Sequence, residues 1–148
     1  MTRTPYSGVA DGIAHQSRCA TQAWNASWQQ HNSDLTAAQV AMLQVLDERE
    51  SADQKTLGSL AAVDRSTLTP LLNPLQARGL ITKATDPRPR SLVTLTTDGR
   101  EQAAHGRIQV EEINHQVEEL LGRERFFILT VLLTELGDVA LIRGLERS

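Results

Sequence analysis

The segment DRSTLTPLLNPLQARGLI, residues 64–81, combines the apolar spacing of a helix with two residues that oppose one. Pro70 and Pro74 each remove a helical hydrogen bond and clash with the carbonyl group one turn earlier, which costs about 3 kcal/mol or more inside a helix. Four leucines nevertheless follow the i, i+3, i+4, i+7 pattern that commits one helix face to a core: Leu68, Leu71, Leu72 and Leu75. We therefore expect a helix that leucine packing holds together and that ends at a cap on Gly79.

The face opposite these leucines carries short, uncharged side chains. Counting about 100° per residue from Leu68, this face holds Ser66, Pro70, Asn73 and Ala77, with Thr69 on its flank. A helix face that meets only solvent usually carries charged and other polar residues, whereas short side chains let a helix approach another surface closely. The pattern predicts a helix that docks against a partner.

Helices are also expected before this segment. We predict a first helix over about residues 7–30 and a second one that begins behind a Thr36 N-cap and ends near Glu50. A short third helix is predicted behind a cap at Ser51 or Asp53. Its expected buried face is formed by Leu57, Leu60 and Ala61.

After the segment, the pattern changes from helix to strand and back. Two β-prone runs, LITKAT and SLVTLT, flank the charged turn DPRPR and predict a hairpin. Two long helices are predicted after the hairpin, the first beginning after Thr96 and the second with the run RERFFIL. The order helix, short helix, tight turn, helix, hairpin is that of a winged helix-turn-helix, so the predicted fold class is mainly α.

Composition limits the classes of protein to consider. The chain has 148 residues, 3% aromatic and 22% charged, and its net charge of -3 argues against nonspecific coating of nucleic acid without excluding a local basic patch. There is no apolar signal segment at the N-terminus, and the run FFILTVLL is far shorter than the roughly 20 residues of a membrane span. We therefore expect a cytoplasmic protein without a membrane partner.

The terminal helices are predicted to form a dimer. The last helix carries more apolar residues than one small domain covers: Phe126, Phe127, Ile128, Leu129, Val131, Leu132 and Leu133. We expect one continuous domain in three parts: a dimerisation helix within 1–34, a winged helix-turn-helix within 35–96, and two dimerisation helices within 97–148.

Three ordered motifs resemble those of the multiple-antibiotic-resistance regulator (MarR) family: LTAAQVAMLQVL, LGSLAAVDRSTLTPLLNPLQARGLI and SLVTLTTDGRE. The resemblance covers about residues 35–101 and implies a dimeric, ligand-responsive repressor whose recognition helix is the proline-containing segment. The partners it implies are double-stranded DNA with a pseudo-palindromic operator, a second copy of the chain, and a small effector; no cofactor is implied. The wing DPRPR is shorter than usual, and Asp86 and Arg88 match the family's acid-x-arginine pattern directly.

The charge distribution agrees with DNA binding. Residues 64–90 hold five basic side chains against two acidic ones. Phosphate contacts are expected from these basic side chains and from two residues before them: Arg65, Arg78, Lys83, Arg88 and Arg90, with Lys55 and Thr56. Base contacts are expected from Ser66, Thr67, Thr69 and Asn73. Pro70 and the Thr69 methyl group are expected to meet thymine methyl groups.

The effector site is expected on the first helix, because the family commonly binds small aromatic acids and phenolics beside its dimerisation helices. The candidate residues are His15, Arg18, Trp24 and Trp28. An arginine pairs a carboxylate with two hydrogen bonds, and a tryptophan stacks on an aromatic ring. The alternative is that both tryptophans belong to the dimer core and that Arg18 is a surface ion-pair partner.

Four other functions, those of an enzyme, a metal sensor, a peroxide sensor and a protein-interaction module, would each need particular residues. The four histidines lack metal-ligand spacing, and no nucleophile or phosphate-loop motif is present, so no catalytic residue and no metal site are predicted. A metal-sensing regulator would need His15, Cys19 and a carboxylate to converge. For Cys19, a buried structural role is favoured over a peroxide sensor, because TAAQV lacks the tyrosines of that branch. A dimeric module that uses its wing against protein is the remaining alternative.

Overall fold

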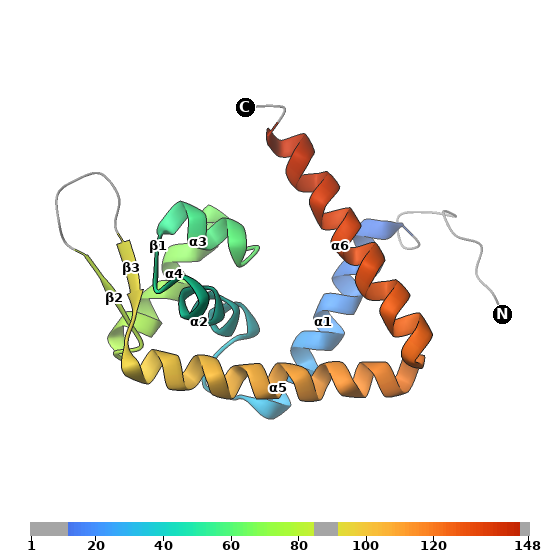
Figure 1. Cartoon of the computed structure of the whole chain (residues 1–148), viewed down its shortest axis with the longest axis horizontal. Coiled ribbons are helices and arrows are strands. Elements are labelled where there is room, and N and C mark those ends of the chain that lie inside the picture. Colours follow the sequence, from blue (N-terminus) through green and yellow to red (C-terminus); the bar gives the residue numbers. More distant parts are fainter. Residues whose placement is uncertain (1–11, 85–91, 146–148) are drawn as a thin grey trace. The chain divides into compact units, whose positions relative to one another are not determined.

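The computed structural model describes residues 12–84 and 92–145, with side chains as far as residue 138. It is mainly helical and confirms the predicted fold class (Figure 1). The chain divides into two compact units, one extending to Val110 and the other beginning at Glu111. The elements in chain order are α1 (Ile13–His31), α2 (Ala37–Arg49), β1 (Ser51–Asp53), α3 (Gln54–Leu60), α4 (Arg65–Ala77), β2 (Ile81–Lys83), β3 (Leu92–Leu95), α5 (Thr97–Leu121) and α6 (Arg123–Leu145).

The start of α2 confirms the predicted cap. The Thr36 hydroxyl accepts a hydrogen bond from the Gln39 backbone amide at 3.1 Å, and the Gln39 side chain accepts one from the Thr36 amide at 2.9 Å. This reciprocal arrangement satisfies two amides that a helix end otherwise leaves open. Behind it the predicted apolar residues are buried: Val40, Leu43 and Leu46.

In α3, Asp53 is the cap rather than Ser51, and its carboxylate accepts from the Thr56 amide at 2.8 Å. The prediction that Leu60 is buried was wrong, because its side chain is 46% exposed. The reason is the position of α4, which packs over Gly58: a Cβ there would lie 3.5 Å from the Leu68 side chain of α4 and 3.1 Å from the Val63 carbonyl oxygen in the turn before it. The buried face of α3 is therefore centred on Leu57 and Gly58, and Leu60 points away from it.

A short strand that the sequence did not predict completes the sheet. The predicted hairpin is present as β2 and β3, and β1 adds to the free edge of β3, giving the antiparallel order β1-β3-β2. Ala52 lies opposite Val93, and Thr82 lies opposite Thr94. β1 has only three residues and pairs with a segment about forty positions later, so no local sequence pattern predicts it.

The helix α4 tolerates its prolines in the way that the leucine spacing predicts. Leu68, Leu72 and Leu75 are buried. The helix ends in a Schellman motif, in which Leu80 N–H donates to the Leu75 carbonyl at 2.9 Å around Gly79, whose φ is +73°. Both prolines lie inside the helix, so the tertiary contacts of its leucine face outweigh the two missing bonds.

A buried side chain from α2 supports α4 near these prolines. Gln39, the capping residue of α2, also donates from Nε2 to the Leu71 carbonyl at 3.2 Å. Leu71 follows Pro70, whose carbonyl lacks its normal helical donor because Pro74 has no N–H. One glutamine thus fixes the start of α2 and the middle of α4 together.

The first part of α5 packs closely on α2 within the first unit. A Cβ at Gly106 would overlap Val40 of α2, so the two helices approach more closely there than any other residue type allows. Asp47 of α2 lies 3.9 Å from Arg100 and 3.5 Å from Arg107 of α5. These contacts join α5 to α2 along two turns.

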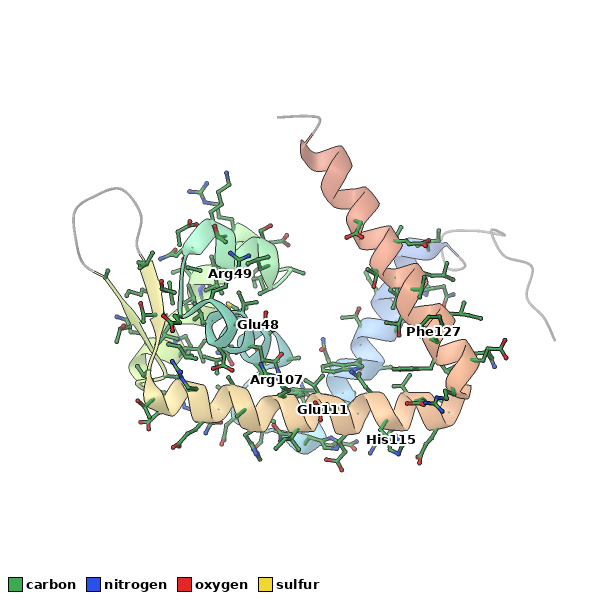
Figure 2. All side chains as sticks on the ribbon, viewed as in Figure 1. Glu48, Arg49, Arg107, Glu111, His115 and Phe127 are labelled. Atoms are coloured by element: carbon green, nitrogen blue, oxygen red, sulfur yellow. The ribbon has the colours of Figure 1, made fainter. Side chains whose placement is uncertain are left out.

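The second unit contains the end of α5 and all of α6. Four leucines of α6 follow helical spacing and remain 39–56% exposed: Leu129, Leu132, Leu133 and Leu136. Ile128 and Phe127, the second of which is labelled in Figure 2, are also exposed on α6. Among the described residues, no helix is both long enough and apolar enough to cross a lipid bilayer.

Candidate DNA-binding surface

The face of α4 opposite its leucines is exposed, as predicted from the spacing. It carries hydroxyl, amide and proline groups and no charge: Ser66, Thr69, Pro70 and Asn73, with Thr67 beside them. Since the buried leucines fix the rotation of the helix, these groups are held outward. Such short donors and acceptors are the groups that contact base edges in a major groove.

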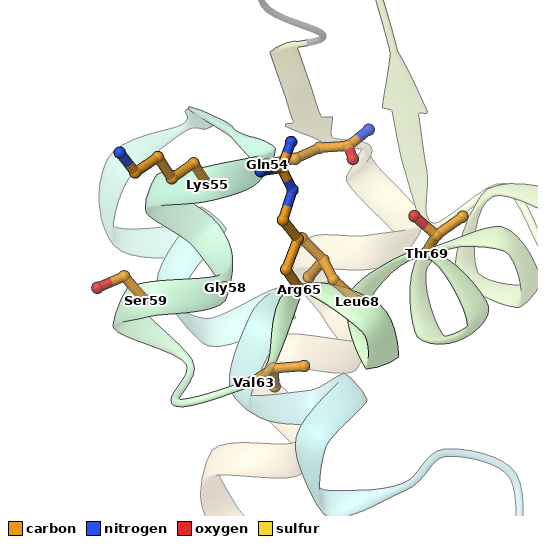
Figure 3. Close-up of a pocket in the computed structure, with 8 residues that line it drawn as sticks. All are labelled: Gln54, Lys55, Gly58, Ser59, Val63, Arg65, Leu68 and Thr69. Carbon is orange, nitrogen blue, oxygen red and sulfur yellow. The ribbon is translucent and has the colours of Figure 1, made fainter.

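A cleft of about 400 Å³ lies between α3 and α4 (Figure 3). Lys55 comes from α3 and Arg65 from the first turn of α4, and both line this cleft together with Thr69. Two cations beside a face of uncharged hydrogen-bonding groups suit a DNA backbone next to its bases, since phosphate contacts come mainly from such side chains.

Thr56 is already engaged inside the chain. Its hydroxyl lies 3.0 Å from the Asp53 carboxylate and donates to it, while its amide forms the cap bond. A phosphate contact by this hydroxyl therefore requires exchange of the bond to Asp53. Arg88 and Arg90, the wing arginines of the prediction, lie outside the described residues.

Lys83 is one of the five basic side chains of residues 64–90 from which phosphate contacts are expected, and the structure gives it a specific partner on this surface. Lys83 ends β2, and its ammonium donates to the Oδ1 atom of Asn73 at 2.9 Å. The pair joins the sheet to the exposed face of α4. A basic residue beside the hairpin was visible in the sequence, but its partner depends on how β2 packs against α4.

The candidate effector residues are distributed around α1 rather than gathered on one face. At about 100° per residue, His15 and Trp24 lie on opposite sides of the helix, and Arg18 lies between His15 and Trp28. Trp24 and Trp28 stack with ring centroids 5.9 Å apart. α1 alone therefore does not bring all four residues to one ligand.

Trp28 has a structural role within its own chain. Its side chain is 1% exposed, and its indole N–H donates to the Leu35 carbonyl at 2.8 Å. The neighbouring Asn32 donates to the buried Gln109 at 3.1 Å, and Gln109 donates to the His31 carbonyl at 2.6 Å. This network ties the α1–α2 junction to α5. No local sequence pattern indicates this role of Gln109.

Cys19 is exposed, so the expectation of a buried cysteine was wrong for the single chain. Its sulfur lies 3.4 Å from Nε2 of His15, one turn earlier on α1. Within residues 12–84 and the described part after 91, no three His, Cys, Asp or Glu side chains converge as metal ligands.

These features define a winged helix-turn-helix DNA-binding protein: the exposed polar face of α4, the two cations beside it, and the three-stranded sheet that contains the hairpin. A sequence model of the MarR family matches residues 35–90. The transcriptional regulator HosA of Escherichia coli O111:H- is 31% identical over 111 residues, which cover 74% of this chain and 80% of HosA. The chain belongs to the MarR family and is a transcriptional regulator.

Solved structures agree with this assignment. BpsR of Bordetella bronchiseptica, whose DNA binding 6-hydroxynicotinic acid regulates, matches with a TM-score of 0.81 at 28% identity, covering 91% of this chain and 99% of that one. PcaV of Streptomyces coelicolor, in complex with its natural ligand, matches with a TM-score of 0.79 at 26% identity, covering 95% of this chain and 99% of that one.

Proposed function

We propose that the protein is a homodimeric repressor in which each α4 helix reads one half-site of a pseudo-palindromic operator. The observation that carries this proposal is the exposed, uncharged, hydrogen-bonding face of α4, held outward by its buried leucines. Because operator DNA is the target, we place the protein in the cytoplasm. A two-fold dimer would set its half-sites about one helical turn, ~10 bp, apart.

The contacts divide into two roles. Base edges are read by α4, through Ser66, Thr67, Thr69, Pro70 and Asn73. The phosphate backbone is held by Lys55, Thr56 and Arg65 around the α3–α4 cleft and by the wing arginines Arg88 and Arg90. Phosphate contacts set affinity and its salt dependence, whereas base contacts set sequence preference.

The apolar row on α6 supports the dimer. Monomeric proteins rarely leave a continuous apolar surface of this kind in water, and Leu129, Leu132, Leu133 and Leu136 form such a row. We propose that a second copy covers it, with residues 1–34 and 97–148 contributing the dimerisation helices.

The effector is proposed to be a small aromatic acid that lowers DNA affinity. The regulation of BpsR by 6-hydroxynicotinic acid supports this ligand class. Arg18 is the proposed carboxylate partner, because it is the exposed cation of the candidate set. An effector acts only if its affinity differs between the DNA-binding state and the other state of the dimer.

A gel-shift with genomic fragments around the protein's own gene tests operator binding. We expect one fragment to shift specifically, with an affinity that falls steeply as salt rises, because phosphate binding releases counterions. Equal binding to all fragments, or none, would instead favour an interaction module that does not read DNA.

Effector release is tested by screening aromatic acids with thermal shift and adding the stabilising ones to the operator complex. Arg18→Ala should need far more effector for release and bind the operator as the wild type does. Arg18→Lys keeps the positive charge but cannot form two parallel hydrogen bonds to a carboxylate. The effector concentration that it needs for release should lie between those of the wild type and Arg18→Ala. A normal response of Arg18→Ala to an identified effector would exclude Arg18 as the carboxylate partner.

A further inference from the structure

Lys83 is placed by the alternation of β2. Side chains two apart in a strand share a face, so Lys83 lies on the same face as Ile81, which is buried, and opposite to the exposed Thr82. Lys83 itself is half-buried. Its aliphatic stem follows the core side of the strand, where β2 packs against α4, and its ammonium emerges at Asn73.

The chemistry of this contact fixes the orientation of Asn73. An ammonium group only donates hydrogen bonds, so the amide atom 2.9 Å from Lys83 Nζ has to be the oxygen. The NH₂ group of Asn73 then points away from Lys83. The ammonium of Lys83 uses one N–H group in this bond and has further N–H groups that can donate beside the Asn73 NH₂ group.

We propose that Lys83 is a specificity-determining residue. By engaging the amide oxygen of Asn73, it makes the Asn73–Lys83 pair select guanine over adenine at one base pair of each half-site. This inference rests on the proposed function, in which Asn73 faces the bases. With Oδ1 engaged by Lys83, the pair offers N–H donors to the DNA. Guanine presents two acceptors in the major groove, N7 and O6, whereas adenine presents one acceptor and one donor.

An asparagine without this restraint has the opposite preference. Its amide commonly contacts adenine with both atoms, donating to N7 and accepting from the N6 amino group. Removing the ammonium therefore predicts a change of base preference and not merely weaker binding. A lysine that only neutralised a phosphate would weaken binding to all sequences alike.

The test uses the full-length protein and its operator, with each base pair replaced in turn by the other three. Wild type is compared with Lys83→Met, Lys83→Arg and Asn73→Ala. Lys55→Met is the matched control, since it removes the same charge from an exposed position on α3. Circular dichroism and thermal melting check that each variant is folded.

We expect wild type to favour guanine over adenine about tenfold at one position of each half-site. Lys83→Met should lose or reverse that preference there and nowhere else, while Lys83→Arg, which retains donors, keeps it. Asn73→Ala should abolish the preference, and adding Lys83→Met should then not alter base choice further.

Two results would overturn the inference. If Lys83→Met weakens all operator variants equally, as Lys55→Met is expected to do, Lys83 is only a phosphate contact. If wild type prefers adenine at the position that Asn73→Ala identifies, Lys83 does not set the orientation of the amide. Absence of any sequence-specific binding by wild type is a different failure, because it removes the proposed function itself.

Discussion

Helices α4 and α6 both carry leucines at helical spacing, but only those of α4 are covered by their own chain. Leu68, Leu72 and Leu75 of α4 are 0–3% exposed. Leu129, Leu132, Leu133 and Leu136 of α6 are 39–56% exposed. The same pattern thus has two different outcomes in one molecule.

The buried leucines of α4 stabilise the fold of the single chain, whereas the exposed leucines of α6 are available for assembly. Burying a leucine side chain contributes roughly 1.5–3 kcal/mol, and α4 gains this within the chain, which leaves its other face free to contact DNA. α6 gains much less within its own unit. Its leucine row therefore stabilises the protein fully only against another surface, which we propose is a second copy.

The largest effect is expected from a charge in the α6 row. Leu132→Asp should convert the dimer to monomers at micromolar concentration, because a carboxylate would have to be desolvated in an apolar interface. Operator affinity should fall with it, since one recognition helix then binds alone. Light scattering and a gel-shift measure the two effects.

Thr134→Asp is the control for this change. It introduces the same charge on α6, on the side away from the leucine row, and should leave the dimer intact. A monomeric wild type, or a dimeric Leu132→Asp variant, would show that α6 is not the interface.

A cavity in the α4 row should act on folding instead. Leu72→Ala should lower the free energy of unfolding by about 2–5 kcal/mol, because Leu72 is fully buried and its removal leaves a void. Urea denaturation, run at two protein concentrations, separates this loss from a change in assembly. A Leu72→Ala variant that dissociates more readily but keeps the wild-type free energy of unfolding would contradict the assignment of this row to the chain's own core.

The sequence predicted the elements that local chemistry determines. The leucine spacing of α4, the Thr36 cap and the Gly79 cap each depend on residues within two turns, and each is present. The exposed face of α4 followed directly from the same spacing.

Features that depend on distant residues could not be predicted. β1 exists because β3 has a free edge, and Leu60 is exposed because α4 covers Gly58 instead. The bond between Lys83 and Asn73 likewise required the packing of β2 on α4.

Changes on the exposed face of α4 should lower affinity for the operator but not for other DNA, whereas changes at a phosphate contact on α3 should lower both. Asn73→Ala should weaken operator binding by about 1–3 kcal/mol and leave binding to scrambled DNA nearly unchanged. Lys55→Ala should weaken both and reduce the salt slope by about one unit. Fluorescence anisotropy over a salt series measures both variants, and equal losses on the two DNAs for Asn73→Ala would exclude it as a base contact.

The smallest effect is expected in the turn between α3 and α4. Ala62 has a φ of +54°, in the left-handed region that favours glycine, within a Schellman motif in which Val63 N–H donates to Gly58. Ala62→Gly should therefore stabilise the fold by up to about 1 kcal/mol. The reciprocal change at the end of α4, Gly79→Ala, should destabilise it by a similar amount, and urea denaturation measures both.

The number of chains on one operator tests the account most directly, because it joins the exposed α6 row to the exposed α4 face. We predict that sedimentation of labelled operator DNA with wild-type protein gives a complex of two chains on two half-sites ~10 bp apart, and that Leu132→Asp gives a weak complex on a single half-site. A single wild-type chain that binds the whole operator with full affinity would contradict it.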